Sequence, residues 1–190
     1  IELASQSDII PVSVEELERR GLLSVEERYV LARLHTAVRD MTRTLDEYRL
    51  NEAPQPVEDF LLDVSRTYVQ LVRDKATAGS DDEKLAVVSI LFHALCEGIT
   101  LFAPIAPYYA ESVYRHLRVA FPDMCGEESV HLRMWPKTDE AYIDGQLEAD
   151  FVVAKDLIGA ILAARDKAQL GVRWPVKEVR VDCSPAQQLA

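Results

Sequence analysis

Two pairs of residues in this sequence have the types and spacing that metal or acid–base chemistry could use. Glu128 and His131 form a Glu-x-x-His pair, the spacing found in carboxylate-bridged metal sites of helical bundles. Those sites need the pair twice, and no other histidine here has a glutamate three residues before it. His93 and Glu97 could serve as a base and its partner, although a polar pair inside a helical core is the simpler interpretation. We therefore expect no metal and no catalytic residue.

A third group could bind phosphate rather than catalyse a reaction. Arginine outnumbers lysine on two neighbouring predicted helices, and the planar guanidinium group suits both phosphate binding and stacking on bases. Tyr48 and Tyr68 lie nearby, and we expect Tyr68 to be in the core. The alternative is a solvated surface with local ion pairs such as Asp63–Arg66. The candidate cations are Arg33, Arg39, Arg43, Arg49, Arg66, Arg73 and Lys75.

The distribution of charge indicates where an anionic partner could bind. The net charge of −11 argues against general nucleic-acid binding, including DNA. Residues 28–75, however, carry eight basic and eight acidic groups, and residues 151–190 carry six against four. These two regions therefore lack the negative net charge of the rest of the chain. Any anionic partner should therefore bind there.

Hydrophobic periodicity predicts the helices that hold these residues. Ser13-x-x-Glu16 and Ser24-x-x-Glu27 are capping boxes, and the second begins a helix over about residues 25–48. Pro54 and Pro56 begin the next helix, since proline is tolerated in the first turn. The buried stripes that we expect are Leu31, Leu34, Val38, Met41, Leu45 and Tyr48 on the first helix, and Val57, Leu61, Val64, Tyr68 and Leu71 on the second.

The longest apolar stretch, residues 85–107, predicts a helix at the centre of the bundle. Its polar residues fall on one narrow stripe at helical spacing: Ser89, His93, Glu97 and Thr100. The stretch is long enough to cross a bilayer, but His93 and Glu97 in its middle and the prolines at its end argue against a membrane span. We expect no contact with a membrane.

The last third of the chain is predicted to be less regular. A helix begins at Pro107 and stops at Pro122, residues 129–135 suggest a short extended piece, and another helix covers about residues 139–169. Residues 179–183 alternate like one β-strand. The sequence thus predicts an all-α fold: an antiparallel bundle of four to five helices, with a short C-terminal strand from a truncated α/β portion. The expected domains are an acidic lead-in at residues 1–24, a bundle at 25–170 and the start of the α/β region at 171–190.

Three widely separated cysteines predict a reduced, cytoplasmic protein without disulfides. They are Cys96, Cys125 and Cys183. Because the sequence begins at Ile1 without a methionine, we also expect a fragment of something larger.

Five motifs occur in an order that resembles a known family. They are DEYRLNEA at 46–53, DFLLDVSRTYVQLVRD at 59–74, LFAPIAPYYAESVY at 101–114, SVHLRMWP at 129–136 and AARDKAQLGVRWPVKEV at 163–179. Together they resemble the anticodon-binding helical bundle of class I aminoacyl-tRNA synthetases. The SVHL-x-x-WP and VRWP-x-K-E-V pieces are most similar to the isoleucyl-tRNA synthetases.

The resemblance implies a part of an isoleucine–tRNA ligase that binds tRNA(Ile) and has the other domains of that synthetase as partners. ATP and magnesium would belong to a separate Rossmann-type domain, whose HIGH and KMSKS signatures are absent here, so we expect no cofactor and no activity in this fragment. Carried over by position, the resemblance adds Tyr48, Asn51, Arg173, Trp174 and Lys177 to the candidate tRNA contacts. Pro54 and Pro56 depart from the pattern of the family, so we expect the turn that holds Asn51 to have a different shape from that of the relatives.

Two alternatives stay open. Valyl and leucyl synthetases share the tyrosine–asparagine–alanine motif and would bind a different tRNA. A helical protein-interaction module would bind no RNA at any salt concentration.

Overall fold

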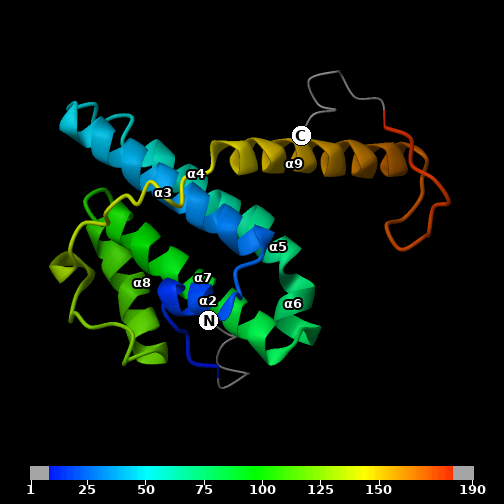
Figure 1. Ribbon diagram of the computed structural model, residues 1–190. Coiled ribbons are helices and arrows are strands. Elements are labelled where there is room, and N and C mark those ends of the chain that lie inside the picture. The colour runs from blue at the N-terminus through cyan, green and yellow to red at the C-terminus, as the bar shows by residue number, and fades with distance from the viewer. Residues whose placement is uncertain (1–8, 182–190) are drawn as a thin grey trace. The chain divides into compact units, whose positions relative to one another are not determined.

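The structure is a computed structural model in which residues 9–181 are described, and over that range it contains helices and no strand (Figure 1). The all-α prediction is confirmed. The helices are α2 (Val14–Arg20), α3 (Val25–Asp46), α4 (Pro54–Asp63), the π-helix η1 (Val64–Tyr68), α5 (Val69–Leu71), α6 (Arg73–Ala78), α7 (Asp81–Phe102), α8 (Pro107–Ala120), the 3₁₀-helix η2 (Val130–Leu132) and α9 (Gly145–Lys167).

The chain divides into two compact units, and the division falls between Ile143 and Asp144. In the first unit, α3 packs against α4 and α7, and α7 packs against α8. Figure 1 shows these helices running alternately up and down, as the short connections predict. The predicted domain boundaries, after residues 24 and 170, differ from this division and stay predictions.

The helix starts follow the serine signals in the sequence. Ser80 and Glu83 form a reciprocal capping box: the Ser80 N–H donates to the Glu83 carboxylate at 2.7 Å, and the Glu83 N–H donates to Ser80 Oγ at 3.3 Å. At α3, the Ser24 N–H donates to the Glu27 carboxylate at 3.1 Å. The prediction at Ser24 is confirmed. At α2, the Glu16 N–H donates to Ser13 Oγ at 3.3 Å as predicted, but the Glu16 carboxylate pairs with Arg19 and Arg20.

The buried stripe of the second helix changes phase at a π-helical turn. The Val69 N–H donates to the Val64 carbonyl, five residues back, so one extra residue enters that turn. Val57, Val64 and Tyr68 are buried as predicted, but beyond the π-turn the buried residue is Val72. The predicted Leu71 is 40% exposed. That prediction was wrong because it continued an unbroken α-helical period.

Helix α7 lies in the core. By length and composition it could cross a membrane, but 67% of its most apolar 18-residue window is buried inside the protein. Its polar stripe faces polar neighbours: Ser89 Oγ accepts the Val12 N–H at 3.0 Å, and Glu97 pairs with Arg133 at 2.6 Å. The predicted His93–Glu97 pairing is replaced by this ion pair. The sequence pattern showed the stripe but not the residues that cover it.

A glycine allows α4 and α7 to approach closely. A Cβ at Gly98 would lie 2.8 Å from Leu61 Cδ2 and 3.4 Å from Phe60 Cε1. We expect Gly98→Val to lower the free energy of unfolding by about 2 kcal/mol, because the added methyl groups overpack this contact. Urea denaturation measures the change. Gly126→Val is the control, since no atom lies within 4 Å of its Cβ position; an equal loss in both variants would contradict the packing argument.

His93 makes stability depend on pH. Burial lowers the pKa of His93 from 6.5 to about 4. Because the unfolded chain binds the proton first as pH falls, we expect stability to be lost between about pH 6.5 and 4, by about 2–3 kcal/mol. Urea midpoints across this range measure the loss. His93→Gln should remove most of it, whereas replacement of the exposed His116 should not; a His93→Gln variant with the wild-type pH profile would contradict this origin.

The segment after α8 is tied to the bundle by side chains. Tyr114 Oη donates to the Glu127 carbonyl at 3.0 Å, and Trp135 Nε1 donates to Thr42 Oγ1 at 2.9 Å. Residues 130–132 form one 3₁₀ turn, so the predicted extended piece is wrong there, although the segment does pack on the bundle. Of the predicted strand, residues 179–181 have no regular structure and the rest lies outside the described residues.

Candidate nucleic-acid interface

The turn after α3 holds an aromatic side chain in an unusual backbone conformation. The Arg49 N–H donates to the Thr44 carbonyl and the Tyr48 N–H to the Leu45 carbonyl, the pattern of a Schellman motif. Tyr48 occupies the left-handed position of this motif, at φ +58°, where glycine is usual. Its side chain is 87% exposed. Tyr48 was predicted both as a core residue and as a tRNA contact, and the core prediction is wrong because the helix ends before it.

Arg49 spans the same turn. Its guanidinium pairs with Glu47 at 2.6 Å and with Glu52 at 2.6 Å. The hydrogen bond to Glu47 and the charges of both carboxylates raise the pKa of Arg49 above its ordinary value. The side chain is thereby oriented over the turn that leads into α4.

Helices α3 and α4 and this turn enclose a cleft of about 460 Å³. Four of the predicted contact residues line it: Arg33, Arg43, Arg49 and Asn51. The arginines of the cleft were predicted from the sequence as contacts, but the other polar residues that line the cleft were not. These residues could have been found from the sequence, because they recur every four positions and so lie on one face of each helix. They are Thr36, Asp40 and Thr44 on α3, and Gln55 and Asp59 on α4.

The charges that line the cleft balance. Its three arginines are matched by Asp40, Glu52 and Asp59, so the formal charges of the cleft sum to zero. Arg43 pairs with Asp40 at 3.3 Å, and the two side chains are 59% and 29% exposed. Ion pairs this exposed contribute little to stability, so Arg43 and Arg49 can leave their carboxylates for a hydrogen-bond acceptor on a ligand at little cost.

Arg33 is held more firmly than the other arginines of the cleft. Its Nε lies 3.5 Å from Asp63 Oδ2, and both side chains are largely buried. Asp63 also accepts hydrogen bonds from the Tyr29 hydroxyl and, at 2.9 Å, from Thr67 Oγ1. Asp63 therefore pairs across the two helices and not with Arg66, as the solvated-surface alternative supposed. Arg33 helps to fix α3 against α4.

Three other predicted arginines lie outside the cleft. Arg39 is half exposed and lies 3.4 Å from Asp40. Arg66, in η1, and Arg73, in α6, are exposed, and neither has an ion-pair partner within the described part of the chain. These two guanidiniums are the ones most available to a phosphate.

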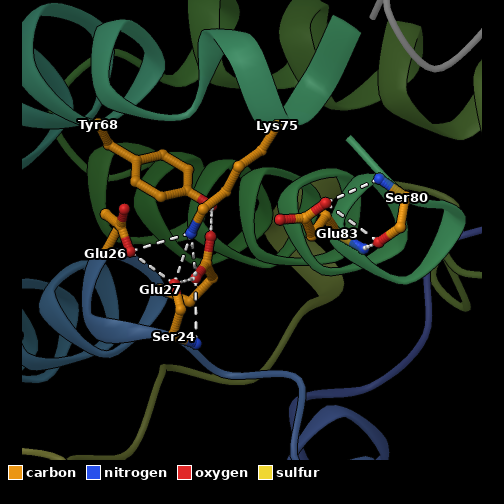
Figure 2. Close-up of polar contacts among 7 residues, drawn as sticks. All are labelled: Ser24, Glu26, Glu27, Tyr68, Lys75, Ser80 and Glu83. Atoms are coloured by element: carbon orange, nitrogen blue, oxygen red, sulfur yellow. Dashed lines mark hydrogen bonds and ion pairs between the residues drawn. The ribbon is translucent and has the colours of Figure 1, made fainter. Parts of the chain in front are cut away.

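Lys75 belongs to a network at the opposite end of α3 (Figure 2). Its Nζ lies 2.6 Å from Ser24 Oγ, 3.0 Å from Glu26 Oε2 and 3.5 Å from Glu27 Oε2. Glu27 is 1% exposed and also accepts the Tyr68 hydroxyl at 3.2 Å. Burial lowers the pKa of Lys75, but the two carboxylates outweigh this, so the pKa is raised; burial and Glu27 raise that of Tyr68. Lys75 joins α6 to the start of α3.

The remaining candidates, Arg173, Trp174 and Lys177, are exposed in the second unit. Neither pair of residues with metal or acid–base spacing forms a site. Glu128 and His131 are exposed, and within residues 9–181 no group of three or more histidine, cysteine or acidic side chains could hold a metal ion.

Comparison with known proteins identifies the family. Residues 27–181 match the family described as the anticodon-binding domain of tRNA ligase. The chain is 35% identical to the isoleucine–tRNA ligase of Methanocella arvoryzae over 90% of its length, 33% identical to that of Methanopyrus kandleri over 93%, and 32% identical to that of Pyrococcus furiosus over 90%. It spans 16% of the length of each of these relatives.

Proposed function

The chain belongs to the family of anticodon-binding domains of tRNA ligases, and from this we propose that it is the part of an isoleucine–tRNA ligase that binds the anticodon arm of tRNA(Ile). The cleft between α3 and α4 carries this proposal. Arg43, Arg49 and Asn51 meet there, beside the exposed Tyr48. Arginine, amide and aromatic side chains are those that bind unpaired RNA bases and their backbone.

The mixed charge of the cleft suits bases better than phosphates. Its carboxylates can accept hydrogen bonds from the edges of splayed bases, and the amides of Asn51 and Gln55 can both accept and donate them. Phosphates bind better to cations that lack a partner. Arg66 and Arg73 offer such cations along α4–α6. We therefore assign base recognition to the cleft and backbone contact to this second pair. Arg33 and Lys75 are the weakest of the predicted contacts, because Asp63 and the Glu26–Glu27 pair hold them. Arg39 lies outside the cleft.

What we propose for the whole protein rests on the names of the relatives. The parent would be an isoleucine–tRNA ligase in the cytoplasm, with its catalytic domain binding ATP and magnesium elsewhere in the protein. This chain would bind tRNA without cofactors and without charging it. Its other partners would be the remaining domains of the parent.

Binding to isoleucine, valine and leucine tRNAs across a salt series tests the function. We expect tighter binding of the isoleucine tRNA, with affinity falling as salt rises. Arg66→Gln/Arg73→Gln should reduce the slope of log K against log salt by about 1.4, since each phosphate contact to single-stranded RNA contributes about 0.7. Arg43→Gln/Arg49→Gln should instead lower the affinity and the preference for the isoleucine tRNA, with a smaller change in slope, because base contacts carry the specificity. Fluorescence anisotropy of labelled tRNA measures both quantities.

The matched control is Arg115→Gln/Arg118→Gln, which removes the same charge from exposed positions on α8. Its slope and affinity should equal those of the wild type. A preference for the valine or leucine tRNA would move the chain to another synthetase. Absence of RNA binding at low salt would favour the protein-interaction alternative.

A further inference from the structure

One arginine holds the turn that follows α9. Arg165 Nη2 donates to the carbonyl of Gly171 at 2.5 Å and to that of Trp174 at 2.6 Å. The Trp174 N–H closes the turn by donating to the Gly171 carbonyl at 3.0 Å. Both ends of this four-residue turn are thus fixed to a single guanidinium on α9.

Apart from the backbone hydrogen bonds that end α9, such as that from the Leu170 N–H to the Arg165 carbonyl at 2.9 Å, little else fixes the turn within its unit. Over residues 144–181, the described part of the second unit, no side chain is buried. A hollow of about 350 Å³ lies beside the last turn of α9 and Leu170–Val172. Arg165 Nε is buried without a hydrogen-bond partner among the described residues, a cost that the two Nη2 bonds outweigh. Arg165 therefore decides where the turn lies.

The turn presents an indole ring with cations on either side. Trp174 is 69% exposed, and its edge rests on Gly171, where a Cβ would lie 3.3 Å from Trp174 Cδ1. Arg173 precedes Trp174 directly in the sequence, Lys177 follows three residues later, and both are exposed. An exposed aromatic face with neighbouring cations is the arrangement on which unpaired bases stack.

We propose that Arg165 is a positioning residue that fixes Trp174 as a stacking surface for an unpaired RNA base, a second RNA contact apart from the cleft. This inference rests on the proposed function. Arg165 acts through the turn and not by touching RNA. A lysine at this position keeps the charge, but its side chain is one bond shorter than that of arginine, so its ammonium group ends short of the position from which Nη2 donates to both carbonyls.

Fluorescence tests the positioning without RNA. In a Trp135→Phe background, Trp174 is the only tryptophan. We expect Arg165→Lys to lower the fluorescence anisotropy of Trp174 and to increase its quenching by acrylamide. The matched control is Lys167→Arg, an equally conservative exchange in the same helical turn, which should change neither. Equal spectra for Arg165→Lys and the wild type would overturn the positioning role.

Binding to isoleucine tRNA tests the RNA contact. We expect Trp174→Ala to weaken binding about tenfold, Arg165→Lys to weaken it several-fold, and the double variant to bind no more weakly than Trp174→Ala alone. Independent, multiplying losses would show that Arg165 touches RNA itself and would overturn the inference. If Trp174→Ala binds normally while the cleft variants do not, only this inference fails. If the wild type binds no tRNA, the proposed function fails with it.

Discussion

Replacing Lys75 by methionine is expected to lower the free energy of unfolding by about 3 kcal/mol. Glu27 is 1% exposed, and Lys75 is the cation that compensates its charge, at 3.5 Å. Removing one partner of a buried ion pair leaves the other charge uncompensated, which costs about 3–5 kcal/mol. Lys75 is itself partly exposed, so the lower end of that range applies. Chemical denaturation at neutral pH measures the loss.

Further variants show whether the loss arises in this network. Lys137→Met, at an exposed lysine, should leave stability unchanged. Adding Glu27→Gln to Lys75→Met should restore part of the loss, because no charge is then left buried, and a double-mutant cycle gives the coupling. Tyr68→Phe removes one hydrogen bond and should cost about 1 kcal/mol. Strictly additive effects of Lys75 and Glu27 would contradict a coupled pair.

The fold was predictable from the sequence wherever local rules decide the structure. The caps at Ser24 and Ser80 and the start of α8 at Pro107 depend on residues within one turn of each other. The π-turn in η1 was not predictable, since it depends on how Val64 and Tyr68 pack in the core, where η1 contacts α3. One extra residue there moved burial from Leu71 to Val72.

Several residues of the candidate site could be predicted from the sequence, but the ion pairs that they form could not. The motif at 46–53 placed Arg49 and Asn51 in one turn, and the structure adds Arg43 from the last turns of α3. Which carboxylate each arginine contacts depends on long-range packing. Asp63 therefore pairs with Arg33, thirty residues earlier in the chain, and Glu97 with Arg133, thirty-six residues later. Long-range packing also places Lys75, a predicted RNA contact, in a network with Ser24, Glu26 and Glu27.

Tyr48→Gly is expected to stabilise the fold and weaken tRNA binding. The left-handed conformation at φ +58° costs a tyrosine roughly 1 kcal/mol more than a glycine, and the exposed ring makes up none of that cost by burial. Glycine here should therefore raise the free energy of unfolding by about 1 kcal/mol. If the ring stacks on an anticodon base, its loss should weaken binding about 5- to 150-fold, the effect of 1–3 kcal/mol.

The changes in stability and in tRNA affinity together show whether Tyr48 takes part in binding, because a tyrosine that contacts RNA should give changes of opposite sign. Gly21 provides the reference, because it occupies the same left-handed position, at φ +67°, after α2. Gly21→Tyr should destabilise the fold by about as much as Tyr48→Gly stabilises it, and should leave tRNA affinity unchanged. Denaturant midpoints and tRNA titrations on the two variants measure both effects. A Tyr48→Gly variant that gains stability and binds tRNA as tightly as the wild type would mean that the exposed ring has no part in binding. A gain in stability with a loss of affinity would mean that Tyr48 is kept in a strained conformation because its ring contacts RNA.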